Sequence, residues 1–204
     1  MNVLLINGSP HKNGCTFTAL SEVAASLQAG GVQTTFFHLG AGPVAGCMAC
    51  GKCRELGRCV LNDAPMTSCV ELLAQADGVV IGSPVYYAGP AGSLCAFLDR
   101  LFYAAGSLLA GKPGAAVVNC RRGGASAAFD RLNKYFTINQ MPVVSSRYWN
   151  STHGLTPDEV RKDLEGMQTM RALGANMAWM LKSMAAAAIP APADEPKIKT
   201  NFIS

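Results

Sequence analysis

The sequence has no long hydrophobic run, although half of its 204 residues are apolar. Its apolar segments are short and are interrupted by glycine and polar residues, whereas a membrane-spanning helix needs about 20 apolar residues in a row. Residues 1–7 also lack the basic start and the small-residue cleavage pattern of a secretory signal. We therefore expect no membrane association and a cytoplasmic location.

Charge of one sign is also scarce. The formal net charge is +4 and no basic run is present, so we expect no nucleic-acid partner. The sequence has no internal repeat, and no Ser-His-Asp pattern or acidic pair needs a hydrolytic explanation. The Walker A pattern and the GxGxxG fingerprint are absent as well, which argues against ATP and against NAD in a Rossmann pocket.

The sequence does contain alternating strand and helix patterns. At this length we expect one domain with a substantial core. Short apolar runs typical of buried parallel strands alternate with segments of helical periodicity. The expected strands cover residues 3–6, 34–38, 78–82, 115–119 and 142–145, and the expected helices cover residues 16–28, 66–75, 92–103 and 125–136. Thr156 and Pro157 open a long closing helix as N-cap and N1 residue. This alternation predicts an α/β fold with helices on both faces of a five-stranded parallel sheet.

Four of the eight cysteines lie in one short loop, with two-residue gaps between the first three and a five-residue gap before the last. Reduced thiols or metal ligands are expected here, because the chain is too long and too rich in core residues for a disulfide scaffold. A ring of thiolates suits iron–sulfur chemistry, whereas structural zinc usually uses two separated CxxC pairs. Zinc, free thiols and a disulfide formed on oxidation remain alternatives. The expected metal ligands are Cys47, Cys50, Cys53 and Cys59.

Three further cysteines, Cys69, Cys95 and Cys120, lie in helix or strand patterns. We expect them to be small buried hydrophobic residues.

Three loops follow predicted strands, where ligands of parallel sheets collect. The first loop, residues 7–16, offers backbone N–H groups, the hydroxyls of Ser9 and Thr16 and a helix start, which suit a monophosphate. The second loop, residues 82–90, presents two adjacent tyrosines as a wall for a flat ring, of which at most one would face a ligand. The third loop, residues 119–126, has two arginines and a glycine pair that allows close approach. The alternatives are a capping turn, core tyrosines and solvated arginines.

Residues 8–16, 82–87, 97–100 and 121–124 together resemble the signatures of the NADPH-dependent FMN reductase and iron–sulfur flavoprotein group, and the likeness extends to about Gly154. The compact cysteine motif resembles the cluster-binding loop of the iron–sulfur flavoproteins. The resemblance implies a flavodoxin-like, doubly wound sheet of order 2-1-3-4-5, noncovalent FMN and a [4Fe–4S] cluster. It also implies NAD(P)H as co-substrate and a homodimer or homotetramer.

By position, the resemblance assigns the FMN phosphate to the first loop, the ribityl chain and ring to the second, and the far side of the ring to the third. The residues expected to bind the cofactor are Ser9, His11, Asn13, Cys15, Thr16, Pro84, Val85, Tyr86, Tyr87, Asn119, Arg121, Arg122, Gly123 and Gly124. The usual first loop of the group has Arg at position 11 and Asn at position 15, so His11 and Cys15 are departures. Cys15 is either a thiol of lowered pKa at a helix start or a plain capping-region cysteine.

Trp149 and His153 lie in a segment that also looks like part of this group. Two roles are open for these residues. One of them would line the flavin or substrate pocket, or both have only a structural role.

The expected function is an FMN-dependent oxidoreductase that passes electrons from NAD(P)H through flavin and the cluster to a quinone-like or protein acceptor. No catalytic side chain is expected, because the flavin carries the chemistry. The alternatives are a cluster-free NAD(P)H:FMN or quinone reductase, a non-enzymatic flavodoxin-type electron carrier, and a scaffold without flavin.

We expect residues 1–188 to form the FMN-binding domain, with a cysteine-loop insertion at residues 41–63. Residues 189–204, which are rich in proline, would form an extended tail that embraces a neighbouring subunit or covers its own core.

Overall fold

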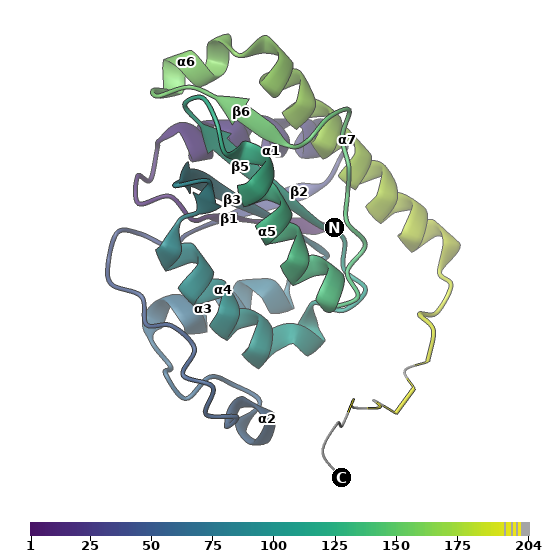
Figure 1. Cartoon of the computed structure of the whole chain (residues 1–204). Helices are drawn as coiled ribbons and strands as arrows, with labels where there is room; N and C mark the ends of the chain where they lie inside the picture. The colour runs from purple at the N-terminus through teal and green to yellow at the C-terminus, as the bar shows by residue number, and fades with distance from the viewer. Residues whose placement is uncertain (194, 197, 199, 201–204) are drawn as a thin grey trace.

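Five parallel strands form the centre of the molecule (Figure 1). The computed structural model describes residues 1–193, 195, 196, 198 and 200. The strands are β1 (Asn2–Asn7), β2 (Gln33–His38), β3 (Gly78–Tyr86), β5 (Gly114–Cys120) and β6 (Ser151–His153), in the order β2-β1-β3-β5-β6. Counted over these five strands, the predicted order 2-1-3-4-5 is confirmed. A sixth strand that was not predicted, β4 (Gly89–Pro90), pairs antiparallel with the end of β3.

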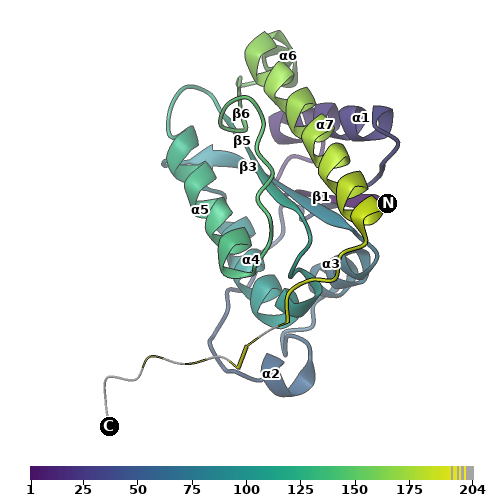
Figure 2. The same ribbon diagram turned by 90° about the vertical axis from the view of Figure 1, so that its right-hand side faces the viewer.

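Helices cover both faces of the sheet, as predicted (Figures 1 and 2). One face carries α1 (Cys15–Ala29) and α7 (Leu164–Ala187), and the other carries α3 (Ala64–Ala74), α4 (Gly92–Ala105) and α5 (Ala125–Ile138). Two short helices, α2 (Cys53–Leu56) and α6 (Pro157–Lys162), and a 3₁₀ turn (Gly106–Leu108) complete the described part of the chain.

The pleat of β1 explains how one strand serves two cores. Leu4 and Ile6 pack with α3, α4 and α5, whereas Val3 and Leu5 pack with α1 and α7, and all four side chains are fully buried. Successive side chains of a strand point to opposite faces, so a continuous apolar run is what a strand covered on both faces requires.

The fifth strand lies later in the chain than predicted. Residues 142–145 make only an isolated bridge, between Val143 and Gly114, and the regular strand is β6, which pairs with the last residues of β5. The prediction was wrong because β6 is an edge strand with a polar sequence, Ser151–His153. One partner strand is enough for its hydrogen bonds, so no apolar run marks it.

The closing helix begins where predicted but is divided. The Thr156 hydroxyl accepts a hydrogen bond from the Glu159 N–H at 3.2 Å and starts α6. The helix then breaks at Asp163, whose ψ of 81° is not helical. The Asp163 carboxylate accepts from the Gly166 N–H at 2.9 Å and caps α7. The cap at Asp163 therefore ends one helix and begins the next.

Helix α7 ends at Ala187, and residues 189–193 lie outside any helix or strand. Part of the predicted tail, including residues 201–204, lies outside the described residues, so the domain boundary and the role of the tail stay predictions. In the part of the chain that the structure describes, no helix combines the length and the apolar character needed to cross a membrane.

Candidate functional site

The first loop is held in shape by its own polar groups. Asn7 is buried at the end of β1, and its amide donates to the Lys12 carbonyl at 3.1 Å while its side-chain oxygen accepts from the Ser9 N–H at 3.1 Å. The Ser9 hydroxyl accepts from the His11 N–H at 3.1 Å. His38, at the end of β2, contacts the Ser9 carbonyl through Nε2 at 2.9 Å. These contacts preorganise the loop before any ligand arrives.

Thr16 supplies the clearest sign of a ligand in this loop. Its side chain is only 1% exposed, and its hydroxyl has no hydrogen-bond partner among the described residues. A buried polar group without a partner costs about 1–3 kcal/mol. Thr16 lies in the first turn of α1, whose N-terminus is not capped by the side chain of any residue that the structure describes. An anion beyond this helix end would satisfy both the hydroxyl and the free N–H groups.

The second loop is a tight hairpin between β3 and β4. Val85 pairs with Pro90 and Tyr86 with Gly89, which leaves Tyr87 and Ala88 as the two turn residues. Both have positive φ, 50° and 60°, a conformation that favours glycine or asparagine. The Tyr87 side chain is fully exposed and lies outside β3, which ends at Tyr86. The two tyrosines therefore do not share one extended segment, the geometry behind the expectation that at most one of them would face a ligand.

The third loop touches this hairpin through Gly124. Gly124 has φ of 86°, and a Cβ built on it would lie 2.8 Å from the Ala88 Cα and 3.2 Å from the Val85 Cγ1. Arg121, Arg122 and Gly123 are exposed. Position 124 therefore requires glycine, because its φ is positive and because the hairpin lies too close for a side chain.

The structure brings the three predicted loops together at the carboxyl ends of β1, β3 and β5. The Gly8 N–H donates to the Gly82 carbonyl at 2.9 Å and joins the first two loops, and Gly124 joins the second to the third. Asn119, which was predicted to bind the cofactor, makes hydrogen bonds within the sheet. Its side-chain amide donates to the Thr152 hydroxyl at 3.0 Å and to the Thr152 carbonyl at 3.2 Å. The Asn119 side chain thus ties β5 to β6.

Cys15 behaves as a plain capping-region cysteine. Burial raises the pKa of its thiol above the ordinary value, which outweighs the lowering by its backbone N–H, and the Glu159 carboxylate raises it further. Partial burial therefore favours the neutral thiol of Cys15 over a reactive thiolate at this helix start.

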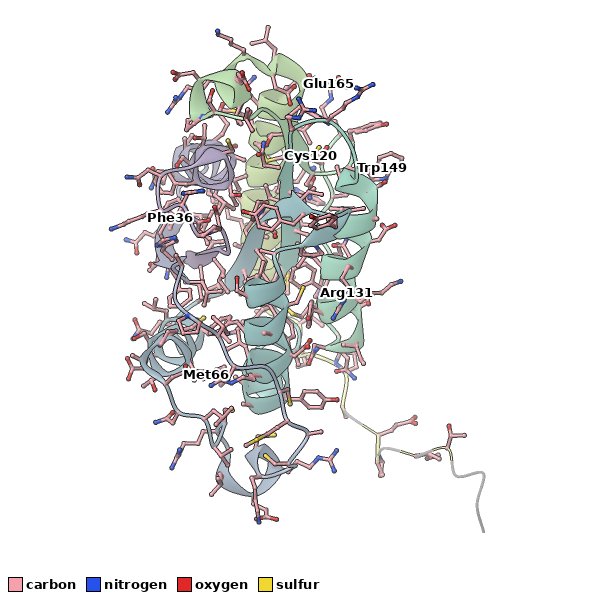
Figure 3. The ribbon with its side chains drawn as sticks, turned by 60° about the vertical axis from the view of Figure 1, so that its left-hand side comes forward. Phe36, Met66, Cys120, Arg131, Trp149 and Glu165 are labelled. Atoms are coloured by element: carbon pink, nitrogen blue, oxygen red, sulfur yellow. The ribbon has the colours of Figure 1, made fainter. Side chains whose placement is uncertain are left out.

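Trp149 lies shortly before β6 (Figure 3), and His153 is the last residue of that strand. The Trp149 ring stacks at a tilt on Tyr148, with 4.9 Å between centroids, and is half exposed. The Asp163 carboxylate accepts from the His153 N–H at 2.7 Å and lies 3.3 Å from its Nδ1. The contacts of His153 thus fix β6 to the start of α7 and give the residue a structural role.

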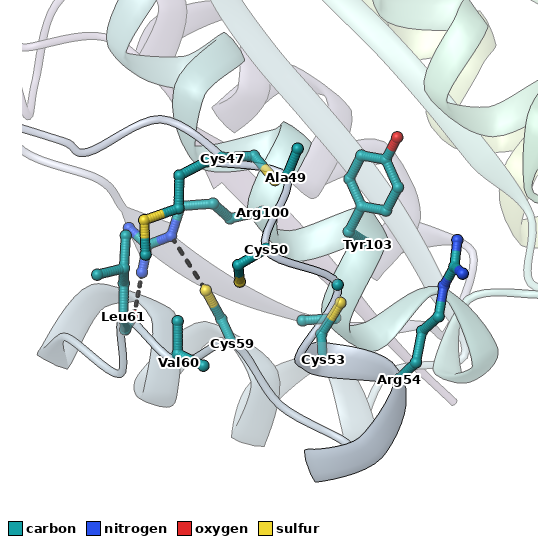
Figure 4. Close-up of a pocket in the computed structure, with 13 residues that line it drawn as sticks. Cys47, Ala49, Cys50, Cys53, Arg54, Cys59, Val60, Leu61, Arg100 and Tyr103 are labelled. Atoms are coloured by element: carbon teal, nitrogen blue, oxygen red, sulfur yellow. Dashed lines mark hydrogen bonds between the residues drawn. The ribbon is translucent and has the colours of Figure 1, made fainter.

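A second candidate site lies in the cysteine loop (Figure 4). Cys47, Cys50, Cys53 and Cys59 all line one cavity of about 190 Å³ against the C-terminal part of α4. Among the described residues, no three side chains of the metal-binding types lie close enough to form a metal site. The donor set suits a sulfur-ligated centre, but the thiols share a cavity without being drawn together.

Arg100 lies at the base of this cavity and is 1% exposed. Its guanidinium donates to the Asp63 carboxylate at 2.7 Å and from Nε to the Cys59 sulfur at 3.5 Å. Burial alone would lower the pKa of Arg100, but the hydrogen bonds to Asp63 and Cys59 raise it above its ordinary value. The cavity therefore holds a permanent positive charge beside its thiols.

The remaining cysteines follow the prediction with one exception. Cys69 and Cys120 are buried, and burial raises the pKa of the Cys69 thiol to about 12. Cys95 was expected to be buried but is only partly so.

Sequence reasoning missed three residues that shape these sites: Asn7, His38 and Arg100. Asn7 could have been found, because an Asn directly after a buried strand often forms such a turn. His38 ends the strand next to β1, so its position depends on strand order. Arg100 is a charged residue on the buried face of a helix, and that conflict was the available signal.

The sheet order and the anion-ready loop after β1 define a flavodoxin-like protein. The chain belongs to the family described as NADPH-dependent FMN reductase, which it matches over residues 1–156. That membership makes the protein a flavin-dependent oxidoreductase with FMN as its cofactor.

Relatives agree with this assignment. An iron–sulfur flavoprotein of Methanocaldococcus jannaschii is 30% identical over 190 residues, which cover 89% of this chain and 98% of the relative. An iron–sulfur flavoprotein of Methanosarcina thermophila is 30% identical over 176 residues, which cover 83% of this chain and 90% of the relative. The structure of a flavodoxin, WrbA-like protein from Agrobacterium tumefaciens superposes with a TM-score of 0.63 at 16% identity. The superposition covers 89% of this chain and 98% of that protein. At that identity the last comparison shows the fold alone.

Proposed function

We propose that this protein is an FMN-dependent oxidoreductase that takes electrons from NAD(P)H and passes them, through a [4Fe–4S] cluster in the cysteine loop, to a quinone-like or protein acceptor. The unpartnered Thr16 hydroxyl at the uncapped start of α1 carries the flavin part of this proposal. It is the feature that a phosphate monoester would satisfy and that an ordinary capping turn would not produce.

The residues of this chain would act by binding and orienting the cofactor. Ser9 and Thr16 would donate hydroxyl hydrogen bonds to the phosphate, and His11, Asn13 and Cys15 lie on the same loop around it. Pro84, Val85, Tyr86 and Tyr87 would flank the ring from the hairpin. Gly123 and Gly124 would let backbone approach it, and Arg121 and Arg122 would stabilise negative charge on the reduced cofactor. When bound, FMN accepts hydride and can release electrons singly or in pairs.

The four loop cysteines would hold the cluster, and two observations support this. All four line one cavity, and two relatives whose matches cover more than four fifths of the chain are named iron–sulfur flavoproteins. Binding would have to draw the thiols together, as often happens when metal binding is coupled to folding of a loop.

A homodimer or homotetramer and a cytoplasmic location are further parts of the proposal that come from the sequence. Mass in solution would test the assembly, and a monomer at micromolar concentration would refute it.

Absorption of anaerobically purified protein tests the cofactors. Flavin bands with an additional broad shoulder are expected. Flavin bands alone would leave the cluster-free reductase or the carrier, and a colourless protein that does not take up FMN would contradict the proposal.

Steady turnover then tests the enzyme against the carrier. We expect continuous NADPH or NADH oxidation when a quinone is supplied in excess. Oxidation that stops after one equivalent of flavin is reduced, with any quinone tried, would favour a carrier that serves partner proteins.

A further inference from the structure

Arg100 connects the two ends of the cysteine loop to the body of the protein. Figure 4 shows its hydrogen bonds to Cys59 and Leu61, at the end of this loop. Its guanidinium donates to the carbonyl of Ala45, before the first loop cysteine, at 3.4 Å. It also donates to the Leu61 carbonyl, after the last one, and to the Asp63 carboxylate. The guanidinium of arginine carries several N–H donors in a fixed fork, so it can reach acceptors at both ends of the loop at once.

The charge of Arg100 is not explained by structural pairing alone. A buried guanidinium is costly unless it is well paired. Within the described part of the chain, Arg100 pairs with the carboxylate of Asp63 alone, and that side chain is 43% exposed. The remaining partners are two carbonyls and the Cys59 sulfur. An anionic centre in the cavity would supply the missing negative charge, because a cluster ligated by four thiolates is negatively charged.

We propose that Arg100 is a positioning residue of the centre bound by the cysteine loop: it holds the loop ends together and donates a hydrogen bond to the Cys59 sulfur that favours the reduced state. This inference rests on the proposed cluster. Reduction adds one electron to the centre, with no bond made or broken, so the negative charge on the sulfur ligands increases. A donor at Cys59 stabilises the more negative form and raises the reduction potential.

The test compares three variants of the full-length, FMN-loaded protein. Arg100→Gln removes the charge and the fork, and Arg100→Lys keeps the charge but loses the fork. Arg54→Gln is the matched control, because Arg54 lines the same cavity from an exposed position and has no side-chain hydrogen bond among the described residues. FMN content serves as the folding check, since the first loop lies at the other end of α4.

Redox titration of the iron-loaded variants gives the main readout. Arg100→Gln is expected to shift the oxidised-to-reduced ratio at fixed potential at least tenfold toward oxidised, which is a midpoint about 59 mV lower for a one-electron couple. Arg100→Lys should fall between Arg100→Gln and wild type, and Arg54→Gln should stay near wild type. Equal midpoints for wild type and Arg100→Gln, or an equal shift in Arg54→Gln, would overturn the proposal.

Proteolysis of iron-free protein tests the anchoring separately. Thermolysin should cut within residues 45–61 at least several-fold faster in both Arg100 variants than in wild type, and this also decides the matter if Arg100→Gln retains no iron. Unchanged cutting would overturn the anchoring. Wild-type protein that never holds iron would instead refute the cluster, a failure visible before any variant is compared.

Discussion

Thr16 is the most informative single residue of the flavin site, because it combines deep burial with an unused hydrogen-bonding group. Such a group lowers the stability of the ligand-free protein and raises its affinity for a ligand that supplies the missing partner. The two effects have opposite signs, so a substitution can separate them.

Thr16→Val should therefore weaken FMN binding while leaving the FMN-free protein as stable or more stable. Loss of a hydrogen bond to a charged phosphate costs about 1.5–3 kcal/mol, or roughly 10- to 100-fold in affinity. FMN titration and denaturant unfolding of the FMN-free protein measure the two quantities.

Thr18→Val is the matched control, since Thr18 is buried on the same helix but its hydroxyl donates to the Gly14 carbonyl at 3.2 Å. It should lower stability by about 1 kcal/mol and change FMN affinity little. The interpretation of Thr16 fails if both variants bind FMN as wild type does.

At this scale the sequence predicted the polar residues that follow a strand, such as Ser9 and Thr16. It could not predict which of their groups are already satisfied. Asn119 is bound to Thr152 only because β6 lies beside β5, and the pKa of the Cys15 thiol is raised because its surroundings partly bury it. These properties depend on contacts between distant parts of the chain.

At the scale of elements, the β3–β4 hairpin stores backbone strain beside the flavin loops. Tyr87 and Ala88 adopt positive φ without being glycine, which costs about 1–2 kcal/mol for each residue. The hairpin tip rests on Gly124 at the start of α5. The spacing between the second and third loops is therefore set by a glycine contact.

Gly124→Ala should disrupt that spacing. The added Cβ would collide with the Ala88 backbone at 2.8 Å, and φ of 86° disfavours any side chain. We expect a loss of about 1–3 kcal/mol in stability and at least tenfold weaker FMN binding, measured by unfolding and by FMN titration.

Gly123→Ala provides the comparison, because a Cβ on Gly123 would meet no atom of the described residues within 4 Å. Its effect on both quantities should be small. Equal losses in the two variants would show that the contact with the hairpin is not what Gly124 contributes.

Elements with strong periodicity were predictable, and those that depend on partners were not. β1 and β5 are buried on both faces and show it as apolar runs. β6 is polar because it has one neighbour, and β4 exists only because the turn after β3 folds back on it. The sequence predicted one long helix over α6 and α7, so the break between them, where Asp163 caps α7, was not predicted.

At the scale of the whole molecule, α4 links the two candidate sites. Helix α4 begins at Gly92, shortly after the β3–β4 hairpin, and its last turns line the cysteine cavity. At a rise of about 1.5 Å per residue, Gly92 and Tyr103 lie roughly 16 Å apart along the helix axis. The order of the sheet and both helical layers followed from alternation along the sequence, whereas this relation between the sites required the structure.

Global stability should depend on pH through Cys69. Its pKa is raised by burial to about 12 from an ordinary value of 9.0. Below pH 9 the Cys69 thiol is neutral in both the folded and the unfolded chain, and its contribution to stability is fully present. Above pH 9 the unfolded chain releases the proton first, so stability falls toward pH 12 by up to roughly 1 kcal/mol per pH unit.

Cys69→Ala should reduce that slope. Denaturant unfolding of wild type and Cys69→Ala between pH 9 and pH 12 measures the difference, and identical slopes would contradict the role of Cys69.

Quantifying FMN, iron and sulfide per chain in anaerobically purified protein tests the central claim most directly. The account predicts one FMN and about four iron and four sulfide for each chain. Well-folded protein that contains no FMN, and takes up none when it is supplied in either redox state, would contradict it.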